Sequence, residues 1–147
     1  MPLLSLAKAD IIINAALRVA RERQFAPLTV AVLDGGGHLV ALKREDGSGI
    51  LRPDIAFGKA WGALGMGFSS REIGERAAKA PVFYSALFAA SQGRMVPSAG
   101  GVLICNAAGE VLGAVGISGD TSDKDEVCAV AGIEAAGLKA DPGGMKS

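Results

Sequence analysis

One stretch of the sequence, Gly113 to Asp120 (GAVGISGD), constrains the fold more than any other. Its branched apolar residues run without a charge until the last position and predict a buried strand. Gly113 and Gly116 carry no side chain, and a glycine weakens a strand unless a helix, another backbone or a ligand must approach closely. The next residues, TSDKDE, predict a helix start with Ser122 or Asp123 as the N-cap. We therefore expect a strand, a glycine turn and an acidic helix start, packed closely against a neighbour.

The glycines of this stretch do not match a dinucleotide-binding motif. In that motif the glycines form the turn after a strand and open a helix whose N-terminus holds the pyrophosphate. Here Gly113 and Gly116 lie inside the predicted strand, and the helix begins with acidic residues, which repel phosphate. We expect no nucleotide cofactor.

Length, charge and cysteine usage limit the class of protein. The 147 residues suit one domain, which we place at residues 1–140, followed by a flexible tail at residues 141–147. Fifteen basic and fifteen acidic side chains cancel, which argues against a nucleic-acid partner. No segment reaches the roughly 20 apolar residues that span a bilayer, and no leader pattern is present. We expect a cytoplasmic protein without a membrane partner, in which Cys105 and Cys128 are small buried thiols.

Hydrophobic periodicity predicts two β-hairpins separated by helices. The predicted strands are residues 28–33, 38–44, 102–106 and 111–117, and the predicted helices are residues 5–23, 53–68, 71–79, a segment from 81, and 124–139. In the helix that begins at Pro53, five residues form the expected apolar stripe, with Lys59 away from it: Phe57, Ala60, Trp61, Leu64 and Phe68. Both hairpins are too apolar to leave a face in water. The pattern therefore predicts an α/β (α+β) fold, an antiparallel sheet of four or five strands with helices on both faces.

Four segments resemble the GlcG/HbpS-like family, also known as the haem-degrading domain family or DUF336. They are LDGGGHLVALKREDG, DIAFGKAW, GRMVPSAGGVLI and GAVGISG followed by DKDE, and the match runs from about Leu6 to Leu138. The resemblance implies a profilin-like α/β/α sandwich and a single GlcG/HbpS-like domain. It also implies haem as the cofactor. Hairpins and helices with little polar cover predict a homo-oligomer, at least a dimer, and the resemblance allows an octamer.

His38 is the only histidine, so any histidine-centred site must use it. One imidazole cannot build a catalytic dyad or a multi-histidine zinc site, but it can serve as an axial ligand to haem iron. The alternative is a residue beside a turn that forms only local hydrogen bonds. The resemblance does not assign an iron ligand to this position, so both interpretations stay open.

Several other residues are candidates for ligand binding. Arg44, Lys59 and Arg94 border the resembling motifs and are expected near one glycine-lined crevice that includes Gly116 and Ser118. Cations there would hold carboxylates, either haem propionates or a small organic acid. Solvated surface charges are the alternative for each of the three.

Two further candidates differ in chemistry. Met95 suits a soft iron ligand or a pocket wall, with an apolar filler as the alternative. Asp125 and Glu126 suit a general acid/base pair, although acidic residues in a first helical turn are also stabilised by the helix dipole, by about 0.3–1 kcal/mol.

Two functions follow from these candidates. The first is a haem-binding and, as the resemblance implies, haem-degrading oligomeric protein. The second is an enzyme or binding protein for a small carboxylate or carbonyl metabolite, in which the cations hold the substrate and Asp125 and Glu126 move protons. The few aromatic residues count against haem, because haem usually needs flat apolar walls.

Overall fold

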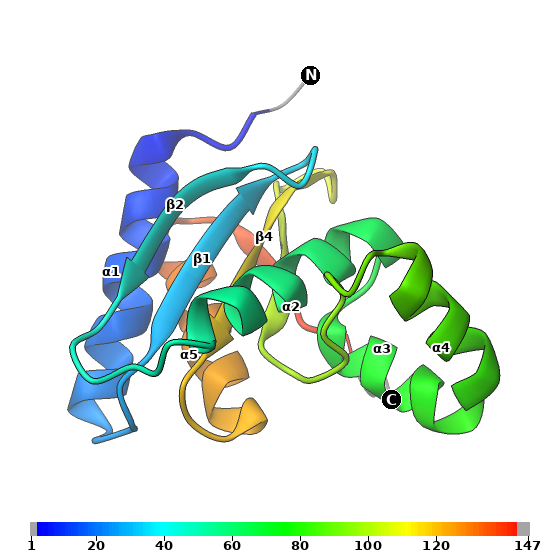
Figure 1. The fold of residues 1–147 in the computed structure, drawn as a ribbon. Coiled ribbons are helices and arrows are strands. Elements are labelled where there is room, and N and C mark those ends of the chain that lie inside the picture. The colour runs from blue at the N-terminus through cyan, green and yellow to red at the C-terminus, as the bar shows by residue number, and fades with distance from the viewer. Residues whose placement is uncertain (1–2, 144–147) are drawn as a thin grey trace.

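The computed structural model describes residues 3–143 and contains one open sheet of five antiparallel strands in the order β2-β1-β4-β3-β5. Helices α1 and α5 cover one face of the sheet and α2 covers the other, with α3 and α4 beyond α2 (Figure 1). The strands are β1 (Thr29–Asp34), β2 (Leu39–Arg44), β3 (Gly101–Cys105), β4 (Val111–Ser118) and β5 (Lys139–Asp141). The helices are α1 (Leu6–Glu22), α2 (Arg52–Met66), α3 (Ser70–Lys79), α4 (Pro81–Ala90) and α5 (Ser122–Ala135). The sequence-based prediction of a helix-covered antiparallel sheet is confirmed.

The C-terminal part of the chain differs from the prediction. Helix α5 ends at Ala135, not Lys139, because Gly137 adopts a left-handed φ of +75° that a helix cannot continue through. The residues after it form β5, which pairs with β3. Asp141 is therefore the last residue of a strand and not the first of a tail, whereas residues 144–147 of the predicted tail lie outside the described part.

The N-cap of α5 was also predicted one or two residues too late. Thr121 has extended backbone angles, and its side chain accepts a hydrogen bond from the N–H of Lys124. Ser122 and Asp123 lie inside the helix. The side chains of Ser5 and Ser69 cap α1 and α3.

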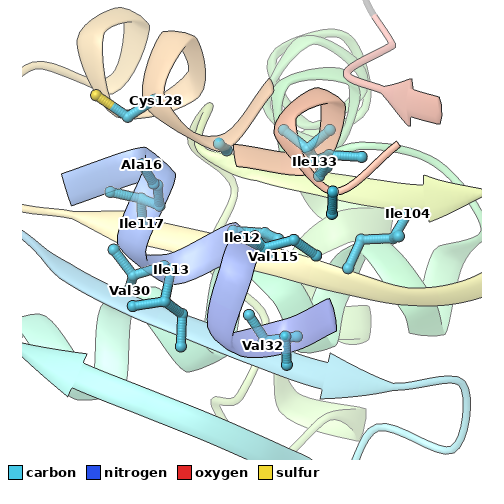
Figure 2. Packing of buried hydrophobic residues seen from close by; sticks show 14 of the residues in the cluster. Ile12, Ile13, Ala16, Val30, Val32, Ile104, Val115, Ile117, Cys128 and Ile133 are labelled. Carbon is cyan, nitrogen blue, oxygen red and sulfur yellow. The ribbon is translucent and has the colours of Figure 1, made fainter. Parts of the chain in front are cut away.

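The larger core lies between the sheet and the α1–α5 layer. Figure 2 shows Ile12 and Ile13 of α1 against Val30 and Val115 of the two central strands, with Ile133 of α5 alongside. All five side chains are fully buried. At roughly 1.5–3 kcal/mol for each large apolar side chain, this layer supplies much of the stability of the fold.

The opposite face has a different construction, because α2 lies directly on two paired glycines. Gly101 and Gly116 are partners across β3 and β4. A Cβ atom on Gly116 would lie 1.8 Å from the carbonyl oxygen of Ala56, and one on Gly101 would lie 2.2 Å from the carbonyl oxygen of Lys59. We call these two residues the glycine pair. The bare position predicted within the 113–120 stretch is thus filled by a helix.

The buried side of α2 is made of small residues, contrary to the predicted stripe. The helix comes so close to the sheet that only alanine and glycine fit between them, apart from Lys59, which is buried. Of the five residues expected to face the core, only Ala60 is fully buried, and the other four are half-buried: Phe57, Trp61, Leu64 and Phe68.

Candidate functional site

His38 lies at the turn of the first hairpin, which the carboxylate of Asp34 holds together. Oδ1 of Asp34 accepts hydrogen bonds of 3.0 Å from the backbone N–H groups of Gly36 and His38. Gly37 takes a left-handed φ of +81°, which glycine adopts without strain. The imidazole is 83% exposed, and its Nδ1 lies 3.5 Å from Oδ1 of Asp34. The ring therefore has one nitrogen next to a carboxylate, and its other nitrogen has no partner among the described residues.

A groove of about 590 Å³ opens beside this turn, between it, the second hairpin and the start of the chain. We call it the turn groove. Leu3 and Val111 contribute apolar surface that is exposed to solvent, and Leu4 and Leu112 form its deeper part. Its full lining is Leu3, Leu4, Asp34, Gly35, Gly36, His38, Glu110, Val111 and Leu112. Apolar walls with a few polar groups are typical of small-molecule sites.

A second cluster of polar residues, which we call the polar end, lies at the other end of β1. Arg44, Thr29 and Ser118 are in register across β2, β1 and β4 and so share one face of the sheet. The hydroxyl of Thr29 lies 2.8 Å from that of Ser48, and Nη1 of Arg52 donates to Oγ of Ser118 at 3.0 Å. Sequence reasoning missed Arg52, because the contact joins segments 66 residues apart.

Lys59 and Asp125 form a buried ion pair at the polar end, with side chains only 3% and 1% exposed. Nζ of Lys59 donates to Oδ2 of Asp125 at 3.1 Å and to the carbonyl oxygen of Ile117 at 2.8 Å. The other oxygen of Asp125 accepts from the N–H of Asp120 at 3.0 Å. The pair joins α2 on one face of the sheet to α5 on the other, past the end of β4.

Burial disfavours both charges of this pair. It lowers the pKa of Lys59 and raises the pKa of Asp125, and the attraction between the two groups opposes each change without cancelling it. Lys59 was expected to lie away from the core side of its helix, and this expectation is wrong.

Glu126 is occupied by another cation. Nε of Arg71 in α3 lies 3.1 and 3.0 Å from its two carboxylate oxygens, and the guanidinium also pairs with Asp123. These hydrogen bonds raise the pKa of Arg71 and keep it charged. The contact ties α3 to the first turn of α5, and nothing in the spacing of Arg71 along the sequence indicated it.

Arg94 and Met95 belong to the segment after α4, and neither lines the turn groove. The guanidinium of Arg94 lies over the Trp61 ring, 3.9 Å from its centre. Met95 is buried in a cluster with Ile73 and Tyr84, as expected of an apolar filler. Trp61 itself lies beside the hairpin turn, because a Cβ on Gly37 would come within 3.2 Å of it.

The structure thus separates residues that the sequence placed around one crevice. Arg44, Lys59, Gly116, Ser118 and Asp125 gather at the polar end, around the start and core-facing side of α2. A shallow hollow of about 440 Å³ beside it has mixed charge, and its lining is Arg21, Pro27, Arg44, Glu45 and Asp46. His38 lies at the opposite end of β1, in the turn groove.

Residues 3–143 contain neither a cluster of metal ligands nor a helix that could span a membrane. Within this part of the chain no group of three or more histidine, cysteine, aspartate and glutamate side chains is placed to hold a metal ion. None of the described helices combines the length and the apolar character needed to cross a bilayer. Cys105 and Cys128 are both buried free thiols, and burial raises the pKa of Cys128 to about 11.

Comparison with known proteins gives consistent likenesses. A family model described as "Haem degrading protein HbpS-like" matches residues 4–134. An uncharacterized 15.0 kDa protein of Citrobacter freundii, from the dhaT-dhaS intergenic region, is 31% identical over 109 residues, which are 74% of this chain and 75% of that protein. The crystal structure of a PduOC–haem complex superposes with a TM-score of 0.84 at 25% identity, covering 93% of this chain and 97% of that one. A double mutant of HbpS from Streptomyces reticuli gives a TM-score of 0.77 at 27% identity, covering 91% and 87%.

Proposed function

The chain belongs to the HbpS-like family of haem-degrading proteins, and from this premise we propose that it binds haem in the turn groove, with His38 as an axial ligand of the iron. One observation carries the proposal. The only histidine of the chain has an exposed imidazole at the rim of an apolar groove. The likeness to a PduOC–haem complex over nearly the whole chain supports the same ligand.

The residues of the groove fit a haem group in size and chemistry. A groove of about 590 Å³ lies within the range of roughly 300–1,000 Å³ typical of small-molecule sites. Leu3, Leu4, Val111 and Leu112 offer apolar contact to a porphyrin. Asp34 and Glu110 on the rim repel carboxylates, so the propionates would point away from them and toward water.

His38 would donate its free nitrogen to the iron, and the apolar walls would exclude water from one side of the ring. Bound haem supplies one-electron and oxygen chemistry. The chain has one histidine, so His38 would be the single imidazole of the chain that holds the iron. We include haem breakdown in the proposal on the family description.

The second function, an acid/base enzyme for a small carboxylate, has less support from the geometry. Asp125 is buried against Lys59, and Glu126 binds Arg71. A proton-transferring group must reach its substrate at about 2.6–3.2 Å, and no described groove is lined by Asp125. These contacts favour structural roles for both carboxylates.

We also propose that the protein forms a homo-oligomer through α4. This helix carries no charged residue, and Val82 and Phe83 are 85% and 60% exposed. An exposed apolar helix is typical of a subunit interface, and an uncharged face meets its own copy across a two-fold axis without repulsion. Light scattering should give a mass above the 14.8 kDa of one chain, and Phe83→Glu should lower it. A mass near that of one chain at all concentrations would refute this part.

Titration with haemin tests the central proposal. We expect a sharp Soret band that saturates at one haemin per chain, and an altered Soret position with weaker binding in His38→Ala. Met95→Leu serves as the control, because Met95 is buried and should leave the spectrum unchanged. Free-haemin behaviour of the wild-type protein at micromolar concentrations would refute haem binding, and an unchanged spectrum in His38→Ala would refute the ligand.

Haem breakdown has its own readout. With oxygen and ascorbate present, the Soret band of the loaded protein should decay faster than that of haemin on serum albumin. Equal decay would leave binding as the whole function.

A further inference from the structure

The two hairpins of the sheet end in turns of the same construction. In the first turn the N–H of Asp34 donates to the carbonyl of His38 at 2.9 Å, and in the second the N–H of Asn106 donates to the carbonyl of Glu110 at 3.0 Å. In both, the side-chain oxygen of the first residue accepts from the backbone N–H groups two and four positions later. The fourth residue of each turn is a left-handed glycine, with φ of +81° in one and +83° in the other.

The second turn shows what this construction does not require. It has Asn106 where the first turn has Asp34, so a neutral amide oxygen holds the two N–H groups equally well. The negative charge of Asp34 is therefore not needed to form the turn. It also has Ala107 and Ala108 where the first turn has Gly35 and Gly36, so neither glycine is required by the backbone.

Two of these three departures, Asp34 and Gly36, concern the side chain of the fifth residue of the turn, His38. Nδ1 of His38 lies 3.5 Å from the Asp34 carboxylate, as Oε1 of Glu110 lies 2.8 Å from the amide nitrogen of Asn106. A Cβ on Gly36 would come within 3.1 Å of Nδ1 and 3.2 Å of Cε1 of His38. The charge of Asp34 and the missing side chain of Gly36 thus both lie next to the imidazole.

We infer that Asp34 is a positioning residue for His38, that Gly36 leaves the space in which the ring lies, and that together they aim Nε2 at the ligand of the turn groove. This inference rests on the proposed haem function. A carboxylate beside the N–H of an iron-bound imidazole fixes its tautomer and makes it a stronger electron donor, which stabilises ferric over ferrous haem.

The variant Asp34→Asn removes only the charge, because Asn106 shows that an amide keeps the turn. The expected results are unchanged thermal unfolding, haemin binding weakened by roughly tenfold or more, and a higher reduction potential of the bound haem. Asp46→Asn removes an exposed carboxylate from the loop at the other end of the sheet and should leave the potential as in the wild type. Equal potentials in the wild type and Asp34→Asn would overturn the inference.

Alanine substitutions at Gly36 and Gly35 distinguish the space that the imidazole of His38 occupies from the space of the turn groove. Gly36→Ala places a methyl group against the imidazole, whereas Gly35→Ala meets only the carbonyl oxygen of Leu112 at 3.7 Å. Gly36→Ala should therefore weaken haemin binding more than Gly35→Ala does. Equal losses in the two variants would overturn the role of Gly36.

A measurement without haem keeps this inference distinct from the proposed function. In ¹⁵N spectra of the free protein at a pH where His38 is neutral, the wild type should favour the tautomer protonated at Nδ1, and Asp34→Asn should shift it toward Nε2. An unchanged tautomer would show that Asp34 does not hold the ring, even if haem binds. A protein that binds no haemin but shows the tautomer shift would refute the proposed function while retaining the contact.

Discussion

Polar side chains lie near both ends of β1, but the two groups differ in their exposure and in their hydrogen bonding. At the Asp34 end, His38 is exposed beside an apolar groove, and one ring nitrogen has no partner within the described residues. At the Thr29 end, the side chains of Lys59, Asp125 and Ser118 are buried. Lys59 donates a hydrogen bond to Asp125, and Ser118 accepts one from Arg52. Among the described residues no buried side-chain nitrogen or oxygen lacks a partner. A polar cluster whose hydrogen bonds are all made within the chain holds the fold together. An imidazole nitrogen without a partner beside apolar walls can instead bind a ligand.

The largest expected effect on stability comes from the glycine pair beneath α2, because these residues decide whether α2 can pack directly on the sheet. Gly116→Ala would place its Cβ 1.8 Å from the Ala56 carbonyl oxygen, and main chain cannot move aside as a side chain can. We expect a loss at or above about 3 kcal/mol, the upper part of the usual overpacking range, measured by urea unfolding. Gly65→Ala on the exposed side of the same helix is the control and should gain about 0.5–1 kcal/mol. Equal stability of Gly116→Ala and the wild type would show that α2 does not rest on this strand.

The ion pair gives the next largest effect. A residue in the first turn of a helix contributes under about 1 kcal/mol through the dipole. From the sequence, this was the structural alternative to an acid/base role for Asp125. Because Asp125 is buried and its two oxygens accept from Lys59 and from the N–H of Asp120, an amide would turn its NH2 group toward one of these donors. Asp125→Asn should therefore cost about 3 kcal/mol, the lower part of the range for breaking a buried pair. Lys59→Met with Asp125→Leu should come closer to the wild type than either single variant. A loss below about 1 kcal/mol in Asp125→Asn would show that the carboxylate contributes to stability only through the helix dipole.

The pH dependence of the same comparison has a definite sign. A raised pKa of Asp125 means that the folded state holds its proton more tightly, so this contribution to stability falls as pH rises above about 4. A lowered pKa of Lys59 means that the folded state releases its proton earlier, so its contribution rises as pH approaches about 10. Relative to the double variant, the wild type should be least stable near neutral pH and gain toward both limits. A difference independent of pH would contradict these shifts.

The sequence predicted most of the fold because local patterns determine most of it. The hairpins follow from alternating apolar residues and turn residues, and α1 follows from its helical period. Strand β5 was missed because three residues carry no period of their own and are ordered by pairing with β3. The large residues of the α2 stripe pack at the edge of the core and stay half-buried, because close approach to the glycine pair selects small residues at the centre of the contact.

The candidate site was predicted less well, since partners far apart in sequence decide what each polar residue does. Lys59 and Asp125 are 66 positions apart, and no spacing rule connects them. Arg71 reaches Glu126 across 55 positions. His38 was identified as a candidate because it is the only histidine, but its exposure and its groove became evident only from the arrangement of the two hairpins.

A smaller effect is expected at the contact between α3 and α5, which lies between the two extremes of burial. Glu126→Gln weakens a partly exposed ion pair and should cost about 0.2–1 kcal/mol. Asp123 is more exposed than Glu126, so Asp123→Asn should cost less. High salt should reduce the difference from the wild type, because exposed charges are screened. A loss of stability as large as that of Asp125→Asn would show that this contact contributes as much as the buried Lys59–Asp125 pair.

The smallest effect on stability should come from the residue with the largest expected effect on function. The His38 side chain is 83% exposed, and the turn is held by Asp34 and the backbone, which an alanine at position 38 leaves in place. His38→Ala should therefore change the free energy of unfolding of the haem-free protein by no more than about 0.5 kcal/mol. Adding haemin should separate the two proteins, because only the wild type gains the stability that a bound ligand confers on the folded state. Thermal melts with and without haemin provide the measurement. Equal stabilisation of the wild type and His38→Ala would move the ligand away from the turn groove and remove the contrast between the two ends of β1.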